Sequence, residues 1–347
     1  MIRPEDQIWM KRCLDLASSR TGYTYPNPLV GSVIVSIEGQ WIAEGRHERA
    51  GESHAERMAL AAVPKGTDLE GATLYVNLEP CAHHGRTPPC AHAIAETPIK
   101  RVVIAHRDPN PLVAGKGIAH LESQGVEVVC GVLELEARWL NRRFLCAMEH
   151  QRPYIVLKWA QCRNGYVDHL RSHGTAEDAS LGTAREISGR RAQLYTHRWR
   201  AEEQAIFVGY RTALLDNPRL DVRHWEGESP RIVVWDPKGQ LPPSLRIFER
   251  NDTLHLTDED LPDGLPSIAH QLTHILYQKG IQSVFIEGGP ATHQLFLEAK
   301  LWDECMIFTS NSVGLEHGVR AALPPCPPSE LQNLDTDTLT LYKNTRA

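Results

Sequence analysis

The 347-residue sequence contains no run of eighteen or more apolar residues, the length that a membrane-spanning helix requires. Basic residues are not in excess either, because 37 Lys and Arg stand against 43 Asp and Glu. The resulting net charge of -6 argues against an electrostatic nucleic-acid binder, which needs cations to neutralise phosphates. Residues 1–12 mix charged and apolar side chains, so we expect no signal peptide there.

Other familiar signatures are missing as well. The sequence has neither the G-x-G-x-x-G of a dinucleotide-binding fold nor the G-x-x-x-x-G-K-[ST] of a P-loop. Its eight cysteines are spread along a large chain rather than concentrated in a small secreted one. This distribution predicts a reduced, cytoplasmic protein in which some thiols bind metal.

A chain of this length favours two domains, with a linker at Gln151-Arg152-Pro153. Alternating strand and helix patterns predict an α/β fold in both halves. In the first domain, residues 1–150, we expect strands at 30–36, 41–44, 72–78, 101–105 and 126–130, and helices at 53–63, 90–96, 117–123 and 133–148. In the second, residues 151–347, we expect strands at 154–159, 205–208, 231–235 and 283–286, and helices at 184–200, 268–279 and 292–301.

The tetrapeptide Ser53-His54-Ala55-Glu56 stands at the start of a predicted helix and has two interpretations. As a capping box, Ser53 would cap the helix and Glu56 would reach back to it. As the H-x-E of a zinc deaminase, His54 would bind the metal and Glu56 would act as general acid and base. The tetrapeptide alone does not decide between the two.

Cys81 and Cys90 favour the metal interpretation, because Cys81 follows a predicted strand and Cys90 begins the next helix. One imidazole and two thiolates suit Zn2+, and three protein ligands leave the fourth tetrahedral position for water. A water bound there has its pKa lowered toward about 7. Glu56 would take its proton and pass it to a departing amine. The alternative is a closed structural zinc site with His83 or His84 as fourth ligand.

Eight residues separate the two cysteines, whereas zinc deaminases usually have P-C-x-x-C. The segment EPCAHHGRTPPC at 79–90 resembles the loop of the bifunctional riboflavin-biosynthesis deaminase/reductase family. PNPLVG at 26–31, GESHAE at 51–56 and DPNPLVAG at 108–115 resemble further motifs of that family, in the same order. The match is dense over residues 10–148 and separates the chain from cytidine and tRNA-adenosine deaminases.

The resemblance implies a cytidine-deaminase-like α/β/α domain followed by a dihydrofolate-reductase-like α/β domain. The first would use one Zn2+ to deaminate a pyrimidine ribosyl phosphate, and the second would use NADPH to reduce its ribosyl group to ribityl. The implied substrate contacts of the deaminase are Asn27, His47, His83, Arg86, Asp108 and Asn110. Amides and carboxylates can read ring edges and Arg86 can pair with phosphate, but each residue alone could equally be a solvated or turn-forming one.

In the second half, the local signal is the Gly-rich turn Glu287-Gly288-Gly289-Pro290 between a predicted strand and helix. Such a turn exposes backbone N–H groups to a phosphate, although it can also be a packing device. The family resemblance continues here at Lys158 and at 209–212, 216–223 and 287–290. It implies substrate contacts at Lys158, Arg200, Leu220, Arg223 and Glu287. It implies that NADPH lies along Gln161, Thr212, Asp216, Gly289, Pro290, Ala291, Thr292, His293, Gln294 and Leu295.

The second half also departs from the family pattern. Cys162-Arg163-Asn164-Gly165 stands where the family often has Ser-Leu-Asp-Gly, and Ala184-Arg185-Glu186-Ile187 lacks the Trp of the Ser-x-Trp-Ile segment. One alternative is therefore a monofunctional deaminase whose second half only binds or assembles. Another is a zinc-stabilised interaction protein without turnover. We further expect a homo-oligomer that binds neither nucleic acid nor membrane.

Overall fold

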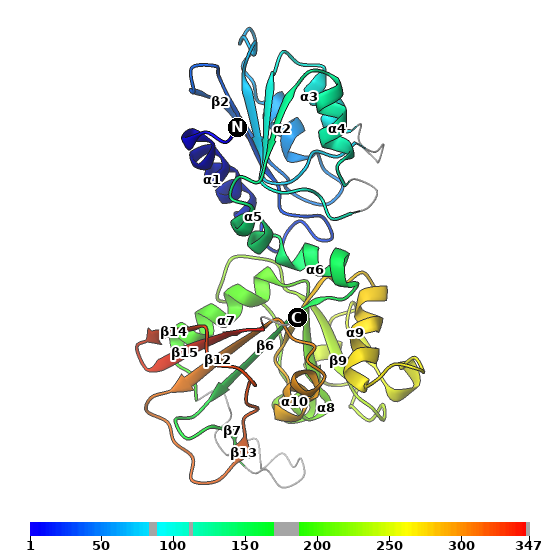
Figure 1. Cartoon of the computed structure of the whole chain (residues 1–347). Helices are drawn as coiled ribbons and strands as arrows, with labels where there is room; N and C mark the ends of the chain where they lie inside the picture. The colour runs from blue at the N-terminus through cyan, green and yellow to red at the C-terminus, as the bar shows by residue number, and fades with distance from the viewer. Residues whose placement is uncertain (83–88, 111–113, 170–186, 345–347) are drawn as a thin grey trace. The chain divides into compact units, whose positions relative to one another are not determined.

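A computed structural model describes residues 1–82, 89–110, 114–169 and 187–344 of the chain. The chain divides into two compact units, Met1–Gln151 and Arg152–Ala347, whose elements are labelled in Figure 1. His83, His84, Arg86, Ala184, Arg185 and Glu186 lie outside the described residues.

The first unit is built on a five-stranded sheet with the order β2-β1-β3-β4-β5. Strand β1 is antiparallel to both β2 and β3, while β3, β4 and β5 are parallel. The strands are β1 (Gly31–Val35), β2 (Trp41–Arg46), β3 (Thr73–Val76), β4 (Arg101–Ile104) and β5 (Glu127–Cys130). All five strands predicted for this half are present, so the α/β interpretation of the first domain is confirmed.

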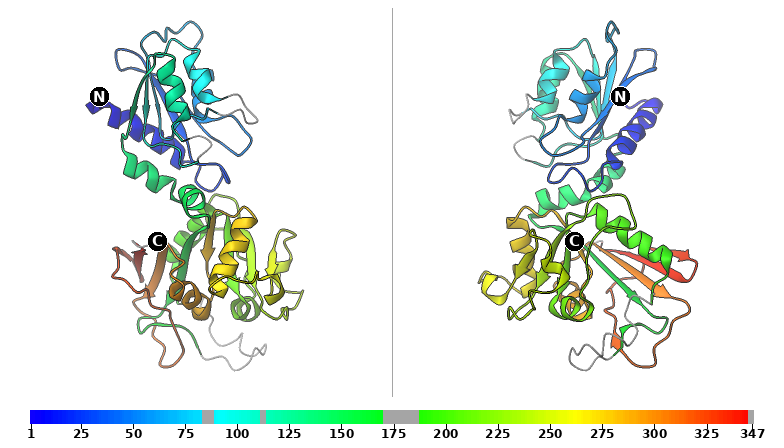
Figure 2. Two further views of the ribbon diagram at one scale, coloured as in Figure 1. Left: turned by 45° about the vertical axis from the view of Figure 1, so that its right-hand side comes forward. Right: turned by 180° about the vertical axis from the view of Figure 1, so that it is seen from behind.

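Helices cover both faces of this sheet (Figures 1 and 2). The covering helices are α1 (Pro4–Ser18), α2 (Ala55–Ala61), α3 (Cys90–Ala95), α4 (Lys116–Ser123) and α5 (Glu134–Leu140), and α6 (Arg142–His150) follows α5 at the end of the unit. Successive strand residues point to opposite faces, so Leu74 and Val102 pack with α2, α3 and α4. Tyr75 and Val103 pack with α1 and α5 on the other face.

Two features of the first unit differ from the prediction. Helix α1 was not anticipated, although its buried residues Met10, Cys13, Leu14 and Ala17 follow a helical period. The single helix predicted at 133–148 is wrong, because the chain breaks at Asn141 between α5 and α6. The buried amide of Asn141 bonds the backbone of a distant loop instead of continuing a helix face.

The second unit contains an eight-stranded sheet with the order β10-β9-β8-β11-β6-β12-β15-β14. The strands from β10 to β12 are parallel, and β15 and β14 extend the sheet in antiparallel fashion. These strands are β6 (Tyr154–Gln161), β8 (Ala205–Gly209), β9 (Arg231–Trp235), β10 (Leu254–Leu256), β11 (Ser283–Ile286), β12 (Glu304–Ser310), β14 (Glu330–Leu334) and β15 (Asp337–Lys343). Strands β7 (Tyr166–Asp168) and β13 (Val319–Arg320) form a separate pair.

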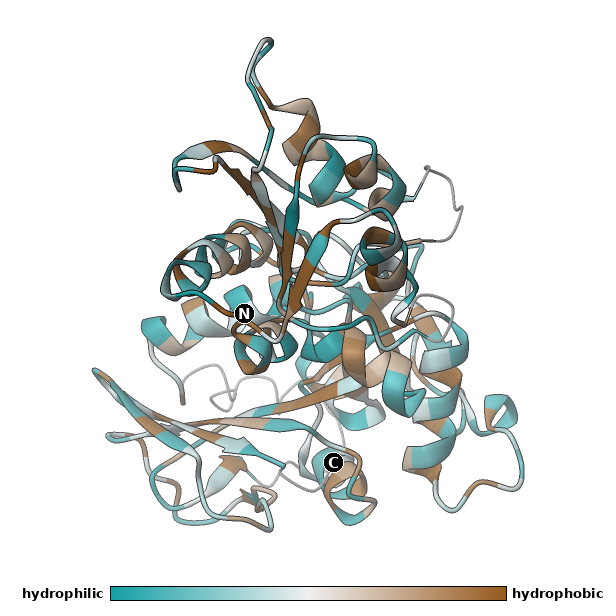
Figure 3. Ribbon diagram, turned by 45° about the horizontal axis from the view of Figure 1, so that its top comes forward, coloured by the Kyte–Doolittle hydropathy of each residue, from teal (hydrophilic) through white to brown (hydrophobic). Residues whose placement is uncertain are grey.

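The helices of the second unit are α7 (Arg190–Glu202), α8 (Tyr210–Asp216), α9 (Ile268–Gln278) and α10 (Pro290–Glu298), with 3-10 turns η3 (Arg246–Phe248) and η4 (Asp258–Asp260). Helices α9 and α10 pack on the sheet face that carries Val284 and Ile286. Trp199 of α7 contacts the rings of Phe285 and Phe308, which lie on the opposite face. Figure 3 shows the hydrophobic colour concentrated on the strands.

The predicted strands 231–235 and 283–286 match β9 and β11 residue for residue. The helix predicted at 184–200 is wrong at its start, because α7 begins at Arg190 after the N-cap Gly189. Helix α8 and strands β7, β10 and β12 to β15 were not anticipated. Among the described residues, no helix combines the length and the apolarity needed to cross a bilayer.

Candidate functional site

Three candidate metal ligands converge in the first unit. His54 is the N-cap of α2, Cys81 lies in the segment after β3, and Cys90 is the first residue of α3. The ligand atoms of the three side chains all lie within 4.8 Å of one another. Nδ1 of His54 is 3.3 Å from Sγ of Cys90 and 3.6 Å from Sγ of Cys81.

Backbone contacts hold the two cysteines together. The N–H of Cys90 donates to Sγ of Cys81 at 3.4 Å, and the N–H of Ala91 donates to the carbonyl of Cys81 at 3.1 Å. The capping-box interpretation of Ser53 and Glu56 is wrong, because His54 is the N-cap of α2 and no side chain caps it. The imidazole of His54 is therefore directed at the thiols rather than used in capping.

The electrostatics of the cluster suit metal binding and proton transfer. The hydrogen bond from the Cys90 thiol lowers the pKa of Cys81 and raises that of Cys90, so Cys81 loses its proton more readily. Burial raises the pKa of Glu56 to about 7, and the nearby Cys81 thiolate adds to that effect. Glu56 is only 4% exposed. A carboxyl group with such a pKa can both accept and donate a proton near neutral pH.

One imidazole nitrogen and two sulfurs form a donor set that fits Zn2+. Within the described part of the chain no fourth His, Cys, Asp or Glu joins this group. His83 and His84, the alternative fourth ligands, lie outside that part. An open position for water on the metal therefore stays a prediction, as does the closed site with a fourth histidine ligand.

His47 and Asn27 lie beside the metal ligands. The rings of His47 and His54 meet edge to face with centroids 5.7 Å apart. Nδ2 of Asn27 is 2.9 Å from Nε2 of His47, and Nδ1 of His47 is 3.1 Å from the carbonyl of Ser53. Burial lowers the pKa of His47, so we assign a neutral ring that accepts at Nε2 and donates at Nδ1.

The loop that carries Asn27 is held by two buried amides that sequence reasoning missed. The side chain of Asn141 accepts from the N–H of Leu29 at 2.8 Å and donates to its carbonyl at 2.9 Å. The side chain of Asn77 donates to the same carbonyl at 2.9 Å and accepts from the N–H of Gly31 at 2.7 Å. The backbone of the loop is therefore fixed on both sides of Leu29.

Asp108 and Asn110 lie in the segment that follows β4. Oδ1 of Asp108 accepts from the N–H of Asn110 at 2.9 Å, which is the hydrogen bond of an Asx-turn. The N–H of Asp108 donates at 3.3 Å to Glu79, another residue that sequence reasoning missed. His83 and Arg86, the remaining predicted contacts of this site, lie outside the described residues.

In the second unit, three predicted substrate residues meet at one largely buried point. Glu287 follows β11 and receives two bonds from Arg200 of α7, at 2.5 and 3.0 Å. Nζ of Lys158 on β6 is 3.5 Å from the same carboxylate. Burial opposes ionisation of Glu287, but the charges of Arg200 and Lys158 hold its pKa at about 2. Burial lowers the pKa of Lys158.

The segment after α8 lies next to this group. Arg200 donates to the carbonyl of Asp221 at 3.0 Å, and the Arg223 side chain pairs with the carboxylate of Asp221. The N–H of Arg223 donates at 3.2 Å to Nδ1 of His197, a residue that sequence reasoning missed. Burial and the nearby Arg200 and Arg223 lower the pKa of His197 to about 4. Leu220 is buried with φ of 54°.

The N-terminal turns of α8 and α10 lie close together where the parallel strands β8 and β11 end. A Cβ on Gly209 would lie 2.5 Å from Oγ1 of Thr292, and a Cβ on Gly288 would lie 2.7 Å from Cβ of Thr292. A Cβ on Gly289 would lie 3.4 Å from Oγ1 of Thr212. The glycines therefore permit the N-terminus of α10 to pack closely against α8. The helix dipole favours a bound phosphate at this N-terminus.

The other predicted cofactor residues differ in their surroundings. The His293 ring is buried, 4.9 Å from the Trp159 ring, and Nε2 lies 3.2 Å from the Ile286 carbonyl. Gln161 bonds Trp159 and Thr309. Pro290 and Ala291 occupy the first turn of α10. Further along this helix, Gln294 donates to Glu298 on the exposed side, and Leu295 packs on the core. Asp216 is the last residue of α8.

The departure at Cys162-Arg163-Asn164-Gly165 retains a hydrogen-bonded turn. The thiol of Cys162 donates to Oδ1 of Asn164 at 2.9 Å, and Sγ accepts from the N–H of Tyr166 at 3.4 Å. Gly165 has φ of 80°, a left-handed conformation that glycine adopts without a steric penalty. The substituted residues therefore maintain the turn between β6 and β7.

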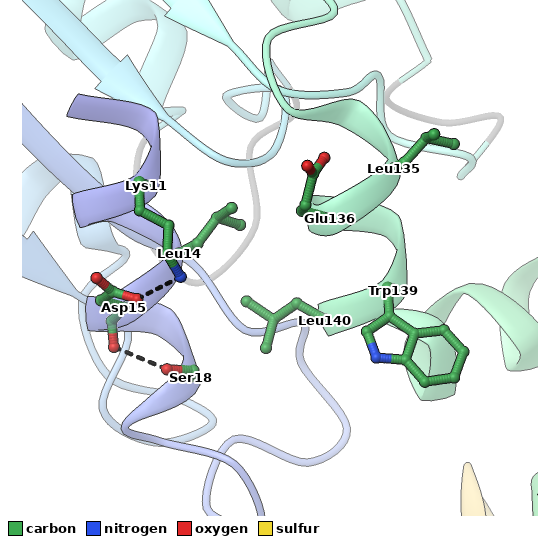
Figure 4. Close-up of a pocket in the computed structure, with 8 residues that line it drawn as sticks. All are labelled: Lys11, Leu14, Asp15, Ser18, Leu135, Glu136, Trp139 and Leu140. Atoms are coloured by element: carbon green, nitrogen blue, oxygen red, sulfur yellow. Dashed lines mark hydrogen bonds and ion pairs between the residues drawn. The ribbon is translucent and has the colours of Figure 1, made fainter. Parts of the chain in front are cut away.

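A hollow of about 480 Å³ lies between α1 and α5, and Figure 4 shows the side chains that line it. Its lining residues are Lys11, Leu14, Asp15, Ser18, Leu135, Glu136, Trp139 and Leu140. Lys11 is paired with Asp15 at 2.8 Å. Because α1 and α5 cover the sheet face opposite to α2 and α3, this hollow is separate from the metal ligands.

Comparison with known proteins gives a family match in each unit. Residues 3–106 match the cytidine and deoxycytidylate deaminase zinc-binding region, and residues 153–313 match the RibD C-terminal domain. The riboflavin biosynthesis protein RibD of Aquifex aeolicus is 38% identical over 330 residues, covering 90% of this chain and 89% of the relative. The Escherichia coli RibD is 35% identical over 332 residues, covering 88% and 87%.

A crystal structure from Thermotoga maritima superposes with a TM-score of 0.86 at 35% identity and covers 98% of both chains. It is described as a diaminohydroxyphosphoribosylaminopyrimidine deaminase/5-amino-6-(5-phosphoribosylamino)uracil reductase. These likenesses extend over both units, and they confirm the predicted deaminase-like and reductase-like pair of folds. The chain belongs to the RibD family of riboflavin biosynthesis proteins.

Proposed function

We propose that this chain is a bifunctional enzyme of riboflavin synthesis, with a deaminase in residues 1–150 and a reductase in residues 151–347. The first domain hydrolyses the ring amine of a diamino-pyrimidinone ribosylamino phosphate. The second reduces the ribosyl group of the product to ribityl. The observation that carries the proposal is the convergence of His54, Cys81 and Cys90 beside the buried Glu56, in a chain of the RibD family.

In the deaminase, His54, Cys81 and Cys90 would hold Zn2+, which supplies a Lewis acid that makes water nucleophilic at neutral pH. Glu56 would accept a proton from the attacking water and deliver it to the leaving amine. Its pKa of about 7 suits both transfers. Asn27 and His47, which bond each other beside the metal ligands, are the next proposed substrate contacts.

Asp108 and Asn110 complete the proposed binding site with polar side chains that can read the edges of a pyrimidine ring. Arg86 suits the substrate phosphate by its charge and its fork of donors. His83 is proposed as a further contact on the same grounds of family resemblance.

In the reductase, we propose that Lys158, Arg200 and Glu287 contact the substrate, together with Leu220 and Arg223. NADPH would lie along Gln161, Thr212, Asp216 and residues 289–295, and it supplies the reducing equivalents. The packing of Thr292 against Gly209 and Gly288 supports the proposal. Because these glycines have no side chain, none obstructs the approach of a ligand to the first turn of α10.

The decisive experiment assays both half-reactions on one purified preparation. We expect zinc-loaded protein to release ammonia from the diamino-pyrimidinone phosphate and then to oxidise NADPH in proportion to the deaminated product, with NADH as the comparison. NADPH consumption that depends on this product would exclude a monofunctional deaminase. Ammonia release without NADPH consumption would refute the second activity, and no ammonia release would refute the first.

We propose in addition that the protein is cytoplasmic and forms a homo-oligomer. None of the eight cysteines forms a disulfide bond, which suits a reducing compartment. Sedimentation velocity over a range of concentrations tests the oligomer, and a single species at the mass of one chain would contradict it.

A further inference from the structure

The Glu79 carboxylate is buried in the first unit, with 3% of the residue exposed. It accepts four backbone N–H groups. Oε2 receives those of Asp108 at 3.3 Å and Gly115 at 3.0 Å, and Oε1 receives those of Gly117 at 3.0 Å and Ile118 at 3.3 Å. One side chain thereby binds both the Asp108 turn and the first turn of α4.

The same residue belongs to the metal-binding segment. Glu79 lies two positions before Cys81, and its own N–H donates to the carbonyl of His106 at 3.1 Å. A Cβ on Gly117 would lie only 2.0 Å from the carbonyl oxygen of Pro80. The first turn of α4 therefore packs directly on the backbone that leads into Cys81.

We propose that Glu79 is a positioning residue of the deaminase, which holds the Asp108–Asn110 turn in register with the metal ligands. This inference rests on the proposed function, in which Asp108 and Asn110 contact the pyrimidine. A carboxylate suits the position because all four contacts are donors and because negative charge at the N-terminus of α4 is stabilised by the helix dipole.

The contacts predict which part of the site depends on Glu79. Cys81 and Cys90 are joined by bonds of their own, from the N–H groups of Cys90 and Ala91. Among the described residues, the side chain of Glu79 instead bonds the segments around Asp108 and α4. Its loss should therefore disturb substrate binding while the metal ligands stay in place.

The test compares Glu79→Gln with Glu122→Gln, which changes an exposed carboxylate on the same helix α4. The amide places an N–H2 group against backbone donors, which leaves them unsatisfied. Because a displaced Asp108–Asn110 turn would lose hydrogen bonds to the pyrimidine, we expect KM for deamination to rise about ten- to hundredfold in Glu79→Gln. The value of kcat and the zinc content should change far less, and Glu122→Gln should match the parent.

Hydrogen exchange supplies a readout that does not depend on activity. Peptides that contain Gly115, Gly117 and Ile118 should exchange faster in Glu79→Gln, whereas those that contain α2 should not. A normal KM, or unchanged exchange at these positions, would overturn the inference. If the parent enzyme fails to deaminate, the proposed function fails, and the exchange measurement still decides whether Glu79 holds this turn.

Glu79→Asp covers the case in which the amide variant does not fold. It keeps the charge but shortens the side chain by one methylene, so the four contacts cannot all be kept. A raised KM with zinc retained supports the positioning role. An unchanged KM, or loss of zinc in this variant as well, overturns it.

Discussion

Arg200 and Glu287 pair across the surface of the second sheet, although they are 87 positions apart in the sequence. Helix α7 supplies the guanidinium, and the segment after β11 supplies the carboxylate. Both side chains are about nine-tenths buried. The charge of Glu287 is maintained there by Arg200 and by Lys158, because water no longer solvates it.

This pair predicts a pH dependence of stability in the second unit. The pKa of Glu287 falls from 4.5 to about 2 on folding, so the pair stabilises the folded form above pH 4.5 and loses this effect as the pH falls toward 2. The difference corresponds to about 3 kcal/mol. Urea unfolding followed by tryptophan fluorescence should show this loss in the parent and a smaller loss in Glu287→Gln. Glu298→Gln, an exposed carboxylate on α10, is the control. Equal pH profiles for the parent and Glu287→Gln would contradict the prediction.

Replacement of Glu56 by Gln should remove the proton carrier without removing a metal ligand. We expect kcat for deamination to fall by about 10²- to 10⁴-fold. Zinc content should stay at the parental level, and NADPH oxidation with supplied deaminated product should be unchanged. Glu52→Gln, an exposed carboxylate in the preceding segment, serves as the matched control. Full deaminase activity in Glu56→Gln would show that another group moves the proton.

Removal of the Cys81 thiol should abolish the deaminase activity and leave the reductase activity unchanged. Loss of an outer-shell partner already weakens metal affinity by about ten- to a hundredfold, so Cys81→Ser should weaken it at least as much. Elemental analysis should report zinc-depleted protein without deaminase activity but with the parental reductase rate. Cys130→Ser, which changes an exposed free thiol, should keep its zinc. Full zinc content in Cys81→Ser would exclude Cys81 as a ligand.

The short distance between Gly209 and Thr292 predicts that substitutions at these two positions change the stability non-additively. Gly209→Ala places a methyl group 2.5 Å from Oγ1 of Thr292, so we expect destabilisation of about 1–3 kcal/mol and weaker NADPH binding. Thr292→Ala removes this oxygen, and the nearest remaining atom is then its Cβ at 3.8 Å. The double variant should therefore recover much of the lost stability in thermal unfolding. Strictly additive losses would contradict the clash.

The sequence predicted the candidate metal ligands well because a local sequence signal marks the place of each one. His54 and Cys90 stand at helix N-termini, and Cys81 follows a strand. The competing capping interpretation failed for a reason that the sequence does not contain. Helix α2 begins one residue after His54 rather than one residue after Ser53.

The residues that the sequence did not reveal act over long separations. Asn141 bonds Leu29 from 112 positions away, and Glu79 reaches α4 from nearly 40 positions away. A polar residue of this kind has no period and no local motif. Strand β12 likewise pairs with β6, about 150 positions earlier, so neither its existence nor its register follows from local pattern.

The hydrogen bonds from Asn77 and Asn141 to the backbone at Leu29 limit the insertions and deletions that this loop can accept. One peptide group is bonded by Asn77 and Asn141, so both the number of residues and the path of the chain between it and Asn27 are constrained. An insertion or deletion there would displace Asn27 from His47 or break the buried bonds. Length changes among functional relatives should therefore fall outside this loop, and the hairpin turn between β1 and β2 is the nearest place free to accept them.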